Sequence, residues 1–241
     1  MNDDSGSRVG ELEFDWDENE RELEAALRDM DFWGGQVEES GEWVSLLLSM
    51  QDKLFQFKDN MESISISFPV MESSAEKSSQ FLCGVMMVGI VSAYEGFVHD
   101  LFSVILDKSS HAELAVSQIE KLNDKDKAYL KLKGCQSYEV LKAALSRATL
   151  HDPNQIARLS SVLFNVILPS LPDDFCAKLL RIRNDYSHNS GYDGHKKHKL
   201  SPLMVVDVFN FIMGLVGSYA DIILQYADLF LKKEEDAEFS S

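Results

Sequence analysis

An arginine and a histidine stand close together at residues 183–188, which read Arg-Asn-Asp-Tyr-Ser-His. A guanidinium group stays charged and offers a planar fork of donors, so Arg183 is suited to holding a phosphate group. Histidine has an unperturbed pKa of about 6.5 and exchanges a proton near neutral pH, which suits His188 to general acid or base catalysis. The Asn184 amide could orient the phosphate or a sugar hydroxyl. These three residues predict proton-transfer chemistry at a phosphate ester, with no metal ion or cofactor.

These six residues resemble the signature of the HEPN superfamily of helical ribonucleases, of which the RiboL-PSP group is one branch. That signature is an arginine, four to six intervening residues and a histidine, frequently with a polar residue after the arginine. Arg183, Asn184 and His188 fit the shortest spacing, and Arg181 fits the longest. The choice between the two arginines therefore stays open, with Asn184 favouring Arg183.

The resemblance implies an activity, an assembly and a biological setting. The activity is that of a metal-independent endoribonuclease, in which the 2′-hydroxyl of RNA attacks the neighbouring phosphate. The assembly is a homodimer whose two motifs line one cleft. The setting is toxin–antitoxin or anti-phage defence, with an antitoxin or a defence protein as partner. The competing interpretation is a non-catalytic HEPN-like module that binds a partner protein or a nucleotide.

The spacing of Arg183 and His188 imposes a geometric condition. Five residues along an ideal helix turn through about 500°, so the two side chains point about 140° apart if the helix continues through both. They converge only if the helix ends near Ser187, or if the two groups meet across a dimer. A purely structural interpretation is also open, in which Arg183 pairs with an acid and His188 caps the helix.

Positive charge is concentrated around the motif. The whole chain has a formal charge of -17, from 23 Lys and Arg against 40 Asp and Glu, whereas residues 178–199, here called the basic island, sum to +4. A local cationic patch on a repelling surface is typical of a protein that docks a polyanion at one place. We expect RNA contacts from Lys178, Arg181, Tyr186, Lys196, Lys197 and Lys199. A solvated lysine-rich loop, and a packing position for Tyr186, are the alternatives.

A polar stripe of Ser92, Glu95 and His99 crosses the most apolar stretch of the chain. Two interpretations are open. Glu95 and His99 are four residues apart and could satisfy each other. Alternatively, Glu95 reaches the motif helix and positions Arg183 or His188, which would make it a supporting residue of the site.

The sequence contains no strong motif for a metal ion or a cofactor. His188, His195 and His198 have only Asp193 among them as a further ligand, and the neighbouring lysines would repel a cation. Gly-rich phosphate loops, a GxSxG elbow and HExxH are absent from the sequence. We expect neither a metal ion nor a cofactor.

The apolar periodicity predicts an all-α helical bundle of HEPN type. Expected helices cover residues 17–30, 43–57, 74–108, 111–121, 124–133, 137–147, 153–168, 172–186 and 202–232. The pair Gly34 and Gly35 should end the first helix, residues 63–68 should form an extended connector, and residues 189–194 a loop. The predicted organisation is an acidic, partly flexible arm (1–31), a single helical domain (32–232) and a flexible acidic tail (233–241).

The remaining composition indicates a cytoplasmic protein without a membrane partner. Three scattered cysteines favour a reducing compartment, and the acidic first twenty residues do not resemble a signal peptide. The uncharged apolar stretches 81–94 and 208–220 are too short for a membrane span. We expect no duplex DNA partner for so acidic a chain, and DNA lacks the 2′-hydroxyl that the expected reaction needs.

Overall fold

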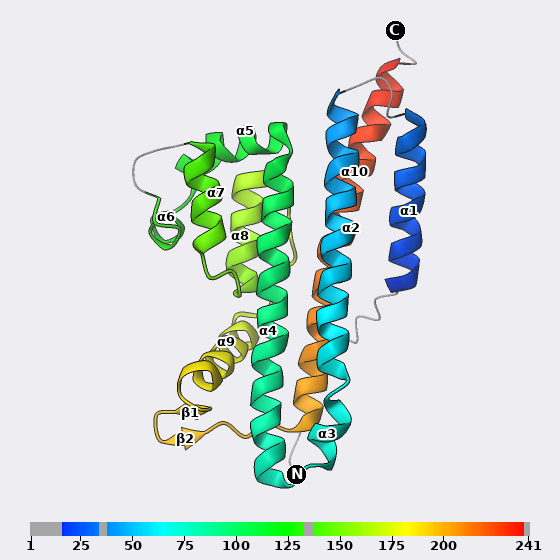
Figure 1. The fold of residues 1–241 in the computed structure, drawn as a ribbon. Helices are drawn as coiled ribbons and strands as arrows, with labels where there is room; N and C mark the ends of the chain where they lie inside the picture. The colour runs from blue at the N-terminus through cyan, green and yellow to red at the C-terminus, as the bar shows by residue number, and fades with distance from the viewer. Residues whose placement is uncertain (1–15, 34–37, 133–136, 239–241) are drawn as a thin grey trace, which may run out of the picture.

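The computed structural model describes the chain except for residues 1–15, 34–37, 133–136 and 239–241 (Figure 1). The described part is helical apart from one small hairpin, which confirms the all-α prediction. The elements are α1 (Trp16–Trp33), α2 (Glu38–Ser65), α3 (Phe68–Ser73), α4 (Glu76–Asp107), α5 (Ser109–Gln118), a 3-10 turn (Ile119–Lys121), α6 (Asp124–Tyr129), α7 (Tyr138–Arg147), α8 (Pro153–Phe164), α9 (Asp173–His188), β1 (Tyr192–Asp193), β2 (Lys196–Lys197) and α10 (Pro202–Glu238). The predicted end of the first helix at Gly34 and Gly35 lies outside the described residues.

Helix α4 is the centre of the bundle. It packs against α2, α3 and α10 on one side and against α5, α7 and α9 on the other (Figure 1). A helix buried on several sides needs apolar residues around most of its circumference, as the sequence of α4 has. At its middle the buried hydroxyl groups of Tyr94 and Tyr219 lie 2.9 Å apart in a hydrogen bond between α4 and α10. Each hydroxyl therefore has a partner in the core.

The connector predicted at residues 63–68 is wrong. Residues 63–65 form the last turn of α2, a turn follows, and Phe68 begins α3. The alternating serines mimic a strand, but the Ser63 and Ser65 hydroxyls donate to the helix carbonyls of Asp59 and Glu62. Side chains that bond back to their own helix are compatible with helical backbone, so the alternation had no structural meaning here.

The loop predicted after the motif contains a hairpin that the sequence did not indicate. Strands β1 and β2 pair antiparallel, with Tyr192 opposite Lys197 and Asp193 opposite Lys196. The two-residue connection begins with Gly194, whose φ of +62° suits a tight hairpin turn. This hairpin and the two residues after it place three lysines and two histidines of the basic island beside α9.

Helix α9 is attached to α4 by an unusually close contact. The Tyr186 ring lies against Gly84 of α4, where an added Cβ would come within 2.0 Å of it, and also against Gly191 at the start of the hairpin. The start of α9 follows its sequence signals, with Pro172 at the cap and Asp173 and Asp174 in the first turn. Two glycines, Gly84 of α4 and Gly191 before the hairpin, therefore make room for the one aromatic ring that joins the motif helix to α4.

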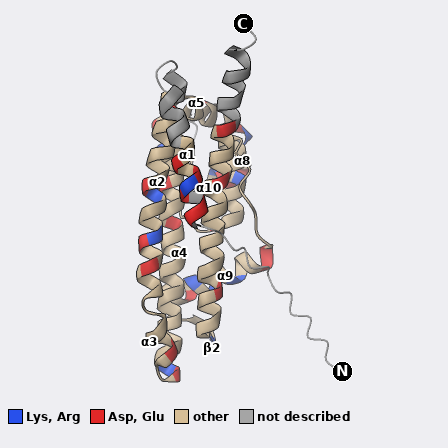
Figure 2. Ribbon diagram, turned by 90° about the vertical axis from the view of Figure 1, so that its right-hand side faces the viewer, with Lys and Arg blue, Asp and Glu red and all other residues tan. Residues whose placement is uncertain are grey.

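Within the described chain, α4 and α10 are each long and apolar enough to cross a membrane by length and composition alone. About half of each apolar window is buried inside the protein (50% and 44%), and the core helices of bundles share this composition. Both helices contain charged residues, so uncharged stretches in the sequence did not indicate helices of this length. Figure 2 shows charged residues spread along α2 and few along most of α10.

Candidate functional site

The motif helix α9 is continuous from Asp173 to His188, so it does not end before the histidine. The first of the two ways in which Arg183 and His188 could converge is therefore wrong. Their side chains leave the helix about 140° apart. The Arg183 side chain is 16% exposed and faces α4, whereas His188 is exposed at the end of the helix. One protomer does not bring the two groups to the same place.

Arg183 lies in a cluster with Glu95 of α4 and His151 of the α7–α8 connection, here called the arginine cluster. Its Nη2 is 3.4 Å from Glu95 Oε2, and the same oxygen is 3.8 Å from His151 Nδ1. Glu95 therefore reaches the motif helix, as one of the two sequence interpretations required. His151, and then Arg183 and His99, lower the pKa of Glu95 below its ordinary value despite partial burial. The carboxylate is thus kept ionised opposite the guanidinium.

The arginine cluster keeps unused hydrogen-bonding capacity. Arg183 Nη1 donates to Asn184 Oδ1 at 3.1 Å, which ties the two motif residues to each other. In the described structure, Arg183 Nε and His151 Nδ1 are both buried without a hydrogen-bond partner. A guanidinium carries five N–H donors, so Arg183 can hold Glu95 and still bind an oxyanion.

The opposite face of α9 carries a different set of polar side chains. Lys178, Arg181, Asp185 and His188 recur at intervals of three, four and three residues, which places them on one stripe of the helix. Asp185 Oδ2 is 2.6 Å from Nε2 of His198, which follows strand β2. Arg181 Nη1 is 3.9 Å from Asp193 Oδ2 of β1. The hairpin is therefore bound by its side chains to the stripe that ends in His188.

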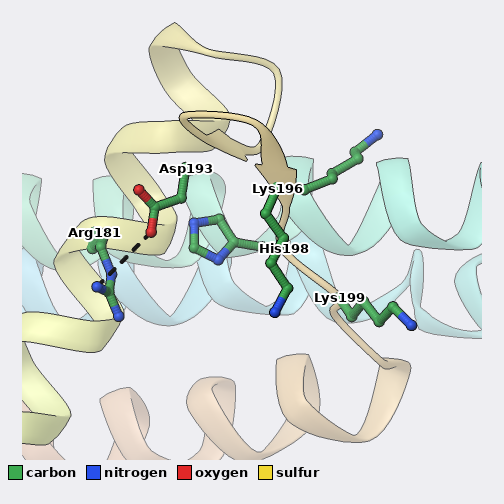
Figure 3. Close-up of a pocket in the computed structure, with 6 residues that line it drawn as sticks. Arg181, Asp193, Lys196, His198 and Lys199 are labelled. Carbon is green, nitrogen blue, oxygen red and sulfur yellow. Dashed lines mark ion pairs between the residues drawn. The ribbon is translucent and has the colours of Figure 1, made fainter.

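A pocket of about 340 Å³ opens between this stripe and the hairpin (Figure 3). Its volume is within the range of small-molecule sites. Figure 3 shows the His198 ring turned toward Asp193 and Arg181, while Lys196 and Lys199 point away from them. The lining is four cations, one imidazole and one carboxylate, namely Arg181, Lys196, Lys197, Lys199, His198 and Asp193. Such a wall is complementary to a phosphate-bearing ligand.

Four of the six residues predicted to contact RNA therefore line one pocket. Lys178 is exposed on the same stripe of α9, outside that lining. Tyr186 is half-buried between Gly84 and Gly191, and its hydroxyl donates to the His198 carbonyl at 3.3 Å. This is the packing position that the sequence left open as the alternative for Tyr186.

The structure also changes which residues could hold a metal ion. Asp185, Asp193 and His198 have ligand atoms within 4.8 Å of one another, whereas His188 and His195 do not belong to this group. The geometry alone would suit a divalent cation. However, Arg181 and the three lysines around the pocket oppose a second positive charge, and His198 Nε2 already bonds to Asp185.

Comparison with protein-family models finds a match to RiboL-PSP-HEPN over residues 47–225. This span includes α4, α9, the hairpin and every residue predicted for the site. The chain belongs to the RiboL-PSP-HEPN family. The match confirms the HEPN resemblance and agrees with the all-α fold. No curated protein and no solved structure matches the chain of this HEPN protein.

Sequence reasoning missed two residues of the candidate site. His151 precedes a helix start far from the motif, and no pattern links it to Glu95. His198 was considered only as a metal ligand. The spacing of Arg181, Asp185 and His188 was a usable signal, because it already places the three residues on one face of a helix.

Proposed function

We propose that this HEPN protein is a metal-independent endoribonuclease that acts as a homodimer, in toxin–antitoxin or anti-phage defence. The observation that carries the proposal is the cationic pocket beside the stripe of α9 that ends in exposed His188. The family is that of HEPN domains, and the rest of the surface is strongly acidic. RNA would therefore be attracted to this one region of the protein.

The reaction needs few groups. The 2′-oxygen of a ribose forms a bond to the adjacent phosphorus while the bond from phosphorus to the 5′-oxygen breaks. A base accepts the 2′-hydroxyl proton, an acid gives a proton to the departing 5′-oxygen, and a cation stabilises the phosphate. His188 would carry out one proton transfer, Arg183 would hold the phosphate, and Asn184 would help to orient it. The products are a 2′,3′-cyclic phosphate and a 5′-hydroxyl.

The divergence of Arg183 and His188 within one protomer supports the homodimer. A second copy that docks beside α9 would bring the Arg183 of one protomer toward the His188 of the other. Phe81 and Val85 are 61% and 51% exposed on α4, within one helical turn of Gly84, where Tyr186 of α9 packs. Exposed apolar side chains four residues apart form a contact surface next to the motif helix. We propose this surface as the one that the second copy covers.

The dimer is tested by sedimentation equilibrium of the purified protein. The wild type should sediment as a dimer, and Phe81→Asp with Val85→Asp should sediment as a monomer that has lost RNA cleavage. Leu48 is exposed to 48% on α2, so Leu48→Asp is a matched control that should stay dimeric. A monomeric wild type, or a variant that stays dimeric, would contradict the proposed interface.

The activity is tested with total RNA and then with a short synthetic RNA, with and without EDTA. Cleavage should persist in EDTA, leave a 2′,3′-cyclic phosphate, and stop when the ribose at the cleaved position is replaced by deoxyribose. It should also weaken steeply as salt rises, because the docking is electrostatic. RNA or nucleotide binding without cleavage would instead favour the non-catalytic module, for which the size of the pocket is the supporting observation.

A further inference from the structure

We propose that His198, oriented by Asp185, is the second proton-transferring group of the RNA cleavage, and that the pocket beside it seats the scissile phosphate. The inference rests on the ribonuclease function proposed above and adds to it. Cleavage by 2′-hydroxyl attack needs one group to accept a proton and one to give a proton. His188 supplies only one of the two, and Arg183 stays protonated throughout.

The Asp185–His198 pair has the geometry of an oriented imidazole. The carboxylate and ring nitrogen are 2.6 Å apart, and the two side chains are 14% and 16% exposed. The hydrogen bond from His198 is the largest of the effects that lower the pKa of Asp185. The carboxyl group is therefore ionised and can only accept hydrogen bonds. Nε2 therefore carries the shared proton, and Nδ1 is the nitrogen left to exchange a proton with substrate.

Backbone hydrogen bonds attach the hairpin in addition to this side-chain pair. The Asp185 carbonyl accepts from the Asn189 and Gly191 amides at 2.7 and 2.9 Å, and the His198 amide donates to the Gly191 carbonyl at 2.9 Å. Tyr186 adds its bond to the His198 carbonyl. The backbone at His198 is thus held from two directions, which leaves the imidazole free for another role.

The position of the pair also fits the rest of the site. Asp185 is three residues before His188 on the same stripe of α9, or about 4.5 Å along the helix axis. His198 lines the pocket together with Arg181, whose guanidinium would hold the phosphate alongside the Arg183 that the proposed dimer brings from the second copy. The charged groups that face His198 are Arg181 and Asp185 from α9, Asp193 from β1, Lys196 and Lys197 from β2, and the adjacent Lys199. A phosphate in this pocket would lie close to Arg181, and cations make up most of the lining.

The step balances without any further reactant. One imidazole takes the proton of the 2′-hydroxyl as the new bond from oxygen to phosphorus forms. The other, already protonated, gives its proton to the 5′-oxygen as that bond breaks. Later proton exchange with water restores both rings, and no oxidant or metal ion is consumed.

The test compares His198→Ala with His195→Ala in cleavage of a synthetic RNA at saturating concentration. His195 is an exposed neighbour on the hairpin turn and does not line the pocket, so its variant should cleave at the wild-type rate. His198→Ala should lower kcat by about 100-fold or more, the usual contribution of a general acid or base. It should also remove one limb of the pH profile of kcat, and added imidazole should restore part of the rate.

Rescue by imidazole separates a chemical role from a structural one. A loss that imidazole does not restore, together with a lower melting temperature, would overturn the proposal and leave the pair as a hairpin clamp. Wild-type cleavage by His198→Ala would overturn it as well. If His188→Ala abolishes cleavage while His198→Ala does not, only this inference fails. If the wild type cleaves no RNA, the ribonuclease proposal fails and this inference fails with it.

Discussion

The contact between Gly84 and Tyr186 makes a quantitative prediction for Gly84→Ala. The new Cβ would lie 2.0 Å from Cδ1 and Cε1 of the ring, whereas ordinary contact begins at 3.4 Å. The ring and the backbone of α9 must therefore shift by about 1.4 Å relative to α4. Gly191 packs against the same ring, so the hairpin that carries His198 would have to move as well.

Two opposing effects determine the stability of Gly84→Ala. Alanine in place of glycine inside a helix stabilises by about 1 kcal/mol, whereas overpacking a fitted contact costs about 1–3 kcal/mol. Gly96 of the same helix has nothing within 4 Å of its added Cβ, so Gly96→Ala reports the helix contribution alone. The difference between the two variants isolates the clash, and we expect Gly84→Ala to be about 1–3 kcal/mol less stable than Gly96→Ala.

The assay is urea unfolding of both variants, followed by RNA cleavage under folding conditions. A misplacement of about 1 Å in catalytic groups costs about 100-fold in rate, so Gly84→Ala should lose cleavage while it remains folded. Gly96→Ala should keep wild-type cleavage. If Gly84→Ala matches Gly96→Ala in both stability and rate, the close packing of α9 on α4 does not position the site.

Three further predictions concern single side chains. His188→Ala should abolish RNA cleavage without changing the melting temperature, because its side chain is exposed; retained cleavage would remove His188 from the mechanism. Glu95→Gln should reduce cleavage and make the free energy of unfolding less dependent on pH in the acid range. The lowered pKa of Glu95 stabilises the wild type above the ordinary value of 4.5, and this stabilisation is lost as pH falls through the folded-state pKa. Unfolding free energies measured from neutral to acid pH check this, and parallel curves would contradict it. Tyr94→Phe should cost about 1–3 kcal/mol because it leaves the Tyr219 hydroxyl buried without its partner, and the double variant with Tyr219→Phe should cost less than the sum of the single variants.

Local signals in the sequence were sufficient for most helices and failed where packing decides. Pro172 with Asp173 and Asp174 marked the start of α9, and the apolar run through Tyr94 marked α4, because both depend on neighbours in the chain. The alternating serines at 63–67 were misleading: they predicted an extended connector, whereas the Ser63 and Ser65 hydroxyls bond back to carbonyls of their own helix. The hairpin at Gly194 was missed because its strands are only two residues long.

The sequence by itself determined the helical class, the family and the concentration of cations around Arg183 and His188. These properties depend on residue type, period and spacing, which are local. Only the tertiary structure decided that Glu95 and His151 meet Arg183 on one face of α9, while Asp185 and His198 meet on the other. Contacts between residues far apart in the chain depend on how helices pack, and here a single ring between Gly84 and Gly191 fixes that packing.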